Sequence, residues 1–272
     1  MLLAAIATHS VTNPVGSAAA LLSAAVLSFV RVSGLFVFAP VVGSSAIPVR
    51  IKAVFAMLLA WLVTPFAMAH SAGIALEPTA ILGELAVGVV FGLTLALLSE
   101  MLTFAGQIAG LQFSFSLVNV LDPNSRIETP VMGQLFGLLG TLTLIAAGLD
   151  RVMIAAFLRT YNAVPPGMAI LGARTGAALV AMAGGIFLAG VELVTPILAA
   201  TLLVEFAIAL MGKLSPQLPV MSFTVPLKTM VGMATLIGSL ALWPRFIEAR
   251  FSALLDAAGG LVAQMAPTVG GR

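Results

Sequence analysis

The stretch AILGELAVGVVFGLTLALLSEMLTF, residues 80–104, decides the fold class of this chain. A helix crosses the hydrocarbon core of a bilayer with about 20 mostly apolar residues, and this stretch holds only two charged residues, Glu84 and Glu100. Similar apolar blocks lie at residues 15–38, 53–69, 131–149, 176–211 and 230–243, and the last continues as an amphipathic segment to residue 264. We therefore predict an all-α, polytopic membrane protein with about six hydrophobic helical segments, forming one integral-membrane domain over residues 1–272.

The prolines and charges indicate where the helices bend and end. Pro65 and Pro196 lie inside apolar blocks, so we expect kinked helices, and residues 176–211 form either one kinked helix or a tight hairpin. Residues 150–174, which carry three arginines, and residues 215–226, which carry three prolines, are expected as linkers without a regular helix.

The composition excludes whole classes of protein. Hydrophobic residues make up 61% of the 272 residues and charged residues 8%, whereas a soluble domain has roughly 25% charged residues. This excludes a soluble enzyme, a disordered chain and a nucleic-acid-binding protein. The solvent of this chain is lipid, or other protein surfaces that are equally apolar.

Residues suited to catalysis or metal binding are scarce. The chain has no cysteine, one tyrosine and two histidines, His9 and His70. No Gly-x-Ser-x-Gly motif is present, and no histidine or carboxylate pair has ligand spacing on one helical face. We therefore predict neither enzymatic activity nor a metal or cofactor.

Charged residues inside the apolar blocks allow more than one interpretation. Arg31, Glu84, Glu100, Glu192 and Glu205 could form a proton or ion pathway, could pair between helices, or could lie near water at block ends. Because a lone carboxylate in an apolar interior is costly, we predict that Glu84, Glu192 and Glu205 pair with cations of this chain or of its partners.

Glycines mark two further features. Gly88-x-x-x-Gly92 is typical of closely packed membrane helices. From Gly106 to Asp122 glycine, glutamine and serine recur at apparent membrane depth, which indicates a non-helical backbone buried in protein or lining a cavity. A central loop over residues 106–130, re-entrant or in a pore, is one interpretation, and an amphipathic interfacial segment is the other.

Four blocks of this sequence resemble the FliR family of flagellar biosynthesis and type III secretion export gates. They are Arg31 with Ala39-Pro40-Val41-Val42-Gly43 and Ile47-Pro48-Val49-Arg50-Ile51-Lys52; Gly83-Glu84 with Gly88 and Gly92; Ala105 to Gln112, including Gln107, with Asp122-Pro123; and Pro216-Gln217-Leu218 with Pro226-Leu227-Lys228. Two positions depart from the family pattern. Ser114 stands where the family has glycine, and Pro219-Val220-Met221 stands where it has Asn-x-Phe.

The resemblance implies a subunit of the flagellar export gate, a multi-pass protein of the bacterial inner membrane and the flagellar basal body. It implies partners of two kinds, a larger ring-forming subunit and a smaller hairpin subunit, packed with this chain into one helical assembly and in contact with unfolded exported proteins. Its family-motif residues would serve partner packing, and its central loop would plug the pore. The plug residues would be Gly110, Leu111, Gln112, Phe113, Ser114, Phe115, Ser116, Leu117 and Val118. The alternative is a secondary transporter of a small solute, whose broken helices would form the binding site.

Overall fold

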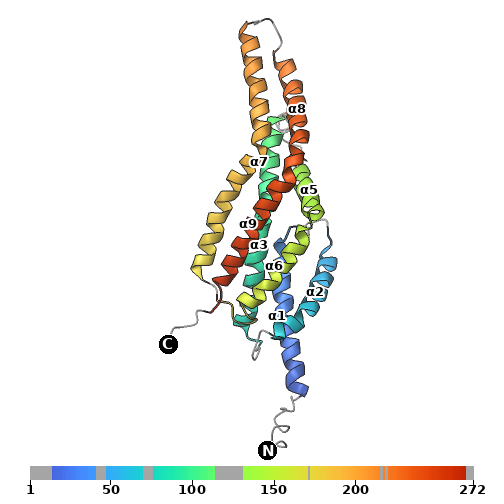
Figure 1. Ribbon diagram of the computed structural model, residues 1–272, viewed down its shortest axis with the longest axis vertical. Helices are drawn as coiled ribbons and strands as arrows, with labels where there is room; N and C mark the ends of the chain where they lie inside the picture. Colours follow the sequence, from blue (N-terminus) through green and yellow to red (C-terminus); the bar gives the residue numbers. More distant parts are fainter. Residues whose placement is uncertain are drawn as a thin grey trace, which may run out of the picture. The chain divides into compact units, whose positions relative to one another are not determined.

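The computed structural model describes residues 14–40, 47–69, 76–113, 131–170, 172–214, 217 and 220–267. Within these ranges all regular structure is helical, so the prediction of an all-α chain is confirmed. The elements are α1 Pro14–Phe38, α2 Val49–Ala69, α3 Pro78–Gln112, α5 Val131–Ala146, α6 Leu149–Ala163, α7 Ala173–Leu214, α8 Val220–Ser239, the 3₁₀ turn η1 Leu240–Leu242, and α9 Trp243–Ala263 (Figure 1). Pro14 and Pro78 open α1 and α3, because proline lacks the N–H that the first turn of a helix leaves unpaired.

Several helices are long and apolar enough to cross a membrane. Five helical segments have the required length and apolar composition by themselves, among them α2 and the 35-residue α3. The pair α5 and α6, bent by 75° between them, meets the same criteria together and would be a sixth span. The predicted multi-pass architecture is therefore confirmed by length and composition.

The chain divides into two compact units. The first comprises residues 1–93, 155–175 and 258–272, and the second comprises residues 94–154 and 176–257. The predicted single domain over residues 1–272 stays a prediction.

In the first unit, α1 packs against α2 and against the first half of α3. The rings of Phe36 and Phe55 meet edge to face at 5.9 Å between α1 and α2. The segment after α6 also belongs to this unit, where the Ile170 N–H donates to the carbonyl of Met265 at 2.8 Å.

In the second unit, α7 and α8 run side by side as a hairpin (Figure 1). The second half of α3 and α5 belong to the same unit, in which Phe136 of α5 meets Trp243 at the start of α9 at 4.9 Å.

Residues 150–163 were expected as part of a linker, and this expectation is wrong because they form α6. The charges that suggested a linker, Arg151 and Arg159, lie on the exposed face of this helix. Met153, Phe157 and Tyr161, spaced by four residues, form its buried face.

The expectations around Pro196 and Pro226 also need correction. Residues 176–211 belong to one helix, α7, with Pro196 inside it, so the hairpin alternative is wrong. Pro226 lies inside α8, which begins at Val220, so residues 220–226 are helical rather than a linker. A proline costs a helix one backbone hydrogen bond, and both helices continue past that loss.

Candidate functional site

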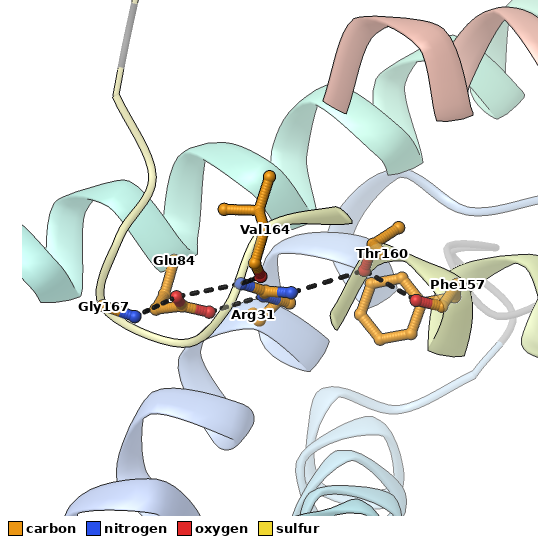
Figure 2. A network of polar contacts seen from close by, with 6 residues as sticks. All are labelled: Arg31, Glu84, Phe157, Thr160, Val164 and Gly167. Atoms are coloured by element: carbon orange, nitrogen blue, oxygen red, sulfur yellow. Dashed lines mark hydrogen bonds and ion pairs between the residues drawn. The ribbon is translucent and has the colours of Figure 1, made fainter. Parts of the chain in front are cut away.

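A buried ion pair joins α1 to α3 in the first unit (Figure 2). Arg31 Nε lies 2.5 Å from Glu84 Oε2, and Arg31 Nη2 donates to Glu84 Oε1 at 2.9 Å. Both side chains have 0% exposure. The guanidinium therefore holds the carboxylate in a two-point contact, the strongest geometry for this kind of pair.

The segment that includes α6 completes the coordination of this pair. Arg31 Nη2 also donates to the carbonyl of Val164 at 2.9 Å, and Nη1 lies 3.4 Å from Thr160 Oγ1. The Gly167 N–H donates to Glu84 Oε1 at 2.8 Å. The Arg31 guanidinium carbon also lies 4.2 Å from the ring centre of Tyr161, a cation–π contact.

Gly167 supplies its N–H from a tight turn. The turn follows Pro165-Pro166, and Gly167 has a φ of +82°, a left-handed conformation that glycine adopts without steric cost. The sequence Pro-Pro-Gly indicates a turn, but nothing in it indicates that the turn binds Glu84. Thr160, Tyr161, Val164 and Gly167 were therefore missed as site residues.

Close packing of α1 on α3 brings the two charges together. A Cβ at Gly88 would overlap the carbonyl oxygen of Arg31, and one at Gly92 would lie 2.9 Å from the carbonyl oxygen of Leu35. Gly34 on α1 has as little space as Gly92, because a Cβ there would lie 2.9 Å from the Leu85 carbonyl oxygen. The close-packing motif Gly88-x-x-x-Gly92 is thus confirmed within the chain, whereas its contact with partners stays a prediction.

Among its described residues, the second unit contains two further ion pairs between helices. Glu205 of α7 pairs with Lys228 of α8, and Glu192 of α7 pairs with Arg250 of α9. The Lys228 side chain is 10% exposed, whereas both members of the Glu192 pair are more than 40% exposed. The prediction that Glu84, Glu192 and Glu205 pair with cations is confirmed, and all three cations belong to this chain.

The start of the predicted central loop is helical, so its expected beginning at residue 106 is wrong. α3 continues through Gln112, which makes Gly110, Leu111 and Gln112 helical residues. Gly106 faces α5, because a Cβ there would overlap the backbone of Met132 and Gly133. The glycines that suggested an irregular backbone instead allow two helices to approach closely.

The residue after α3, Phe113, is anchored on the α7–α8 hairpin. Its side chain is 2% exposed, and its ring occupies the space that a Cβ at Gly232 would need. The Thr229 hydroxyl is shared between two acceptors, the carbonyl of Phe113 at 3.1 Å and that of Val225 at 2.9 Å. One residue earlier, Gln112 Oε1 lies 3.3 Å from Thr201 Oγ1, whose hydroxyl also donates to the carbonyl of Ile197 at 2.8 Å. Sequence analysis assigned Phe113 to the plug but missed this anchor.

The other predicted residues are distributed along the chain. Pro40 is buried after α1, Pro48 and Arg50 are exposed around the start of α2, and Lys52 is half-buried. Gln107, Gln217 and Pro226 are exposed. Outside the described residues lie Gly43, Ser114, Phe115, Ser116, Leu117, Val118, Asp122, Pro123 and Pro216. Among the described residues, no group of three or more histidines or carboxylates could hold a metal ion.

Comparison with known proteins identifies the family. Residues 22–254 match the family described as "Bacterial export proteins, family 1". The chain belongs to this family. This confirms the resemblance drawn from the sequence motifs, and nothing in the comparisons supports the small-solute transporter.

Relatives of this chain occur in several bacteria. "Flagellar biosynthetic protein FliR" of Escherichia coli (strain K12) is 24% identical over 86% of this chain and 91% of its own length. The protein of the same name from Caulobacter vibrioides is 27% identical over 85% and 94%. That from Bacillus subtilis (strain 168) is 26% identical over 89% and 96%. The similarity therefore covers nearly the whole length of each relative.

Proposed function

We propose that this chain forms part of the channel through which unfolded proteins cross the bacterial inner membrane on their way to the growing flagellum. Its place as a subunit of the flagellar export apparatus follows from its family and from its FliR relatives. Its apolar helices fit a multi-pass membrane protein, and its flagellar relatives fit a place in the inner membrane at the basal body. The match over residues 22–254 carries this conclusion.

The arrangement of polar groups supports a packed subunit rather than a solute-binding site. Each of the three ion pairs named above joins two helices of the described chain, and the most buried pair is fully coordinated within its own unit. The family is a component of protein export and is not known as an enzyme. That this chain itself catalyses nothing is part of the proposal.

Other membrane subunits complete the gate. The chain is a member of a flagellar export complex, and we propose that it contacts both a larger ring-forming subunit and a smaller hairpin subunit. Large exposed hydrophobic residues on α2, α7 and α8 support this role, because such surfaces need lipid or other apolar helices. Examples are Trp61 and Leu62 on α2, Leu203 and Phe206 on α7, and Phe223 and Met230 on α8.

The segment after α3 is the proposed pore plug. Residues Gly110 to Phe113 are held by α3 and by the α7–α8 hairpin. We propose that the polypeptide from Ser114 to Val118 closes the channel at rest. The anchor at Phe113 then determines where the plug begins.

Two measurements test this function. Tagged chain is purified from native membranes, and mass spectrometry should find both kinds of partner subunit. Deleting residues 114–118, which leaves α3 and the Phe113 anchor in place, should raise ion leak through the assembled gate. An intact complex with the deletion and unchanged conductance would contradict the plug, and a chain that brings down no other subunit would contradict the whole proposal.

A further inference from the structure

Glu100 differs from the other carboxylates that lie inside apolar helices. Glu84, Glu192 and Glu205 each pair with an arginine or lysine of another helix in this chain. Glu100 lies in the second half of α3 with its side chain exposed. In the part of the chain that the structure describes, it forms no ion pair and no hydrogen bond through its side chain.

The helix that carries Glu100 cannot neutralise it. The sequence contains no lysine or arginine between Lys52 and Arg126, so α3 has carboxylates and no basic residue. One turn before Glu100 lie Ala96 and Leu97, which offer no polar group. One turn after it lies Thr103, but its hydroxyl already donates to the carbonyl of Ser99 at 2.9 Å.

A stripe of exposed side chains extends from Glu100 along α3. Gln107 lies two turns further on, Leu111 lies one turn beyond that, and both are exposed. The ring of Phe104, between them and half-buried, meets Phe187 of α7 edge to face at 5.0 Å. α7 therefore borders the stripe on one side, and the other residues of the stripe face outward.

We propose that this stripe, Glu100 with Gln107 and Leu111, is the docking surface for a helix of another export subunit that places a lysine or arginine against Glu100. The inference rests on the proposed function, which supplies such subunits. A charge on an apolar helix is costly against lipid tails. An opposite charge on a neighbouring helix removes that cost, as it does for the other three carboxylates of this kind.

The spacing of the polar groups favours a helix over a lipid head group. Seven residues of α-helix place Glu100 and Gln107 about 10 Å apart along the axis of α3. The head groups of each leaflet lie at one depth, and the two layers are separated by about 30 Å of hydrocarbon, so one head group cannot serve both side chains. A helix packed along α3 presents groups at both depths, and polar side chains join membrane helices in this way.

The test uses the export complex purified from native membranes through a tag on this chain. Glu100→Gln removes the charge and keeps the shape, so we expect the yield of one partner subunit to fall by about three- to thirty-fold. Glu100→Asp keeps the charge and should retain most of the yield. The matched control is Glu248→Gln, at an exposed carboxylate of α9, which should leave the yield unchanged.

Two further measurements separate docking from folding. The Glu100 side chain forms no ion pair and no hydrogen bond with the described residues. Glu100→Gln should therefore leave the unfolding temperature of the isolated chain in detergent unchanged. Glu100→Lys should lose the partner, and an acidic residue in place of a basic residue on the partner's helix should restore it. A Glu100→Gln chain that melts early would assign the residue to folding and overturn the proposal.

The remaining outcomes are also decisive. Full partner yield with Glu100→Gln would overturn the docking surface while leaving the proposed function intact. Glu100→Gln could also leave the partner yield normal and lose a bound lipid with an amine head group, which mass measurement of the intact complex would detect. That result would assign the stripe to lipid and would also overturn the proposal. If the unaltered chain brings down no other subunit, the proposed function fails first.

Discussion

Glu84→Gln should lower the free energy of unfolding of this chain by about 3–5 kcal/mol, because it leaves Arg31 charged and buried without a counter-ion. Glu84 accepts three hydrogen bonds, two from Arg31 and one from the Gly167 N–H. A glutamine amide has one acceptor oxygen, and its NH₂ group would face the donors of the guanidinium. With its oxygen in the place of Oε1, the amide keeps two of these bonds and loses the one from Arg31 Nε, worth about 1.5–3 kcal/mol; the repulsion between its NH₂ group and the guanidinium adds to that loss.

The assay is denaturant unfolding of the purified chain in detergent, followed by far-ultraviolet circular dichroism. Arg31→Met combined with Glu84→Gln removes the stranded charge and leaves the Val164 carbonyl without its donor. We therefore expect a loss of only about 1–3 kcal/mol for the double variant. Glu248→Gln, the exposed control, should stay within about 0.5 kcal/mol of the unaltered chain. A loss below about 1 kcal/mol for Glu84→Gln, or a double variant less stable than the single one, would refute the reasoning.

Three further changes test packing at other places. Gly88→Ala should destabilise the chain by about 1–3 kcal/mol in the same assay, because its Cβ meets the backbone of α1; Gly184→Ala, with nothing within 4 Å, should raise stability by about 0.5–1 kcal/mol. Gly232→Ala should displace the Phe113 ring and raise ion leak through the assembled gate, whereas Gly238→Ala, with open space around it, should leave the leak unchanged. Arg250→Gln should cost no more than about 1 kcal/mol, because its pair with Glu192 is exposed; a larger loss on denaturant unfolding would contradict this.

The apolar runs in the sequence predicted that the helices exist, but they did not predict the residues at which the helices end. Gly106 and Gly110 were interpreted as signs of an irregular backbone, since glycine weakens an isolated helix. In the structure they lie in α3, and Gly106 meets the backbone of Met132 on α5. Whether a glycine breaks a helix or admits a neighbour depends on a helix that is distant in the sequence.

The sequence predicted that the buried carboxylates are paired, but it did not predict which cations they pair with. The cost of an isolated charge in an apolar interior predicted that the carboxylates would be paired. This cost does not identify the cation of each pair, because the two members lie far apart in the sequence. Arg31 and Glu84 are 53 residues apart, and Glu192 and Arg250 are 58 apart. Such pairings follow from helix packing, which a single sequence does not reveal.

The order of synthesis gives the Arg31–Glu84 pair an intermediate state. Gly167, which donates its N–H to Glu84, is made 83 residues after that carboxylate. At about 5–20 residues per second, the ribosome delivers it roughly 4–17 s later. An Arg31–Glu84 pair that forms before Gly167 is made has neither the Val164 nor the Gly167 contact, because both residues come later in the chain. The first two partners can therefore cancel each other's charge early, whereas the full set of contacts requires α6 and the turn that follows it.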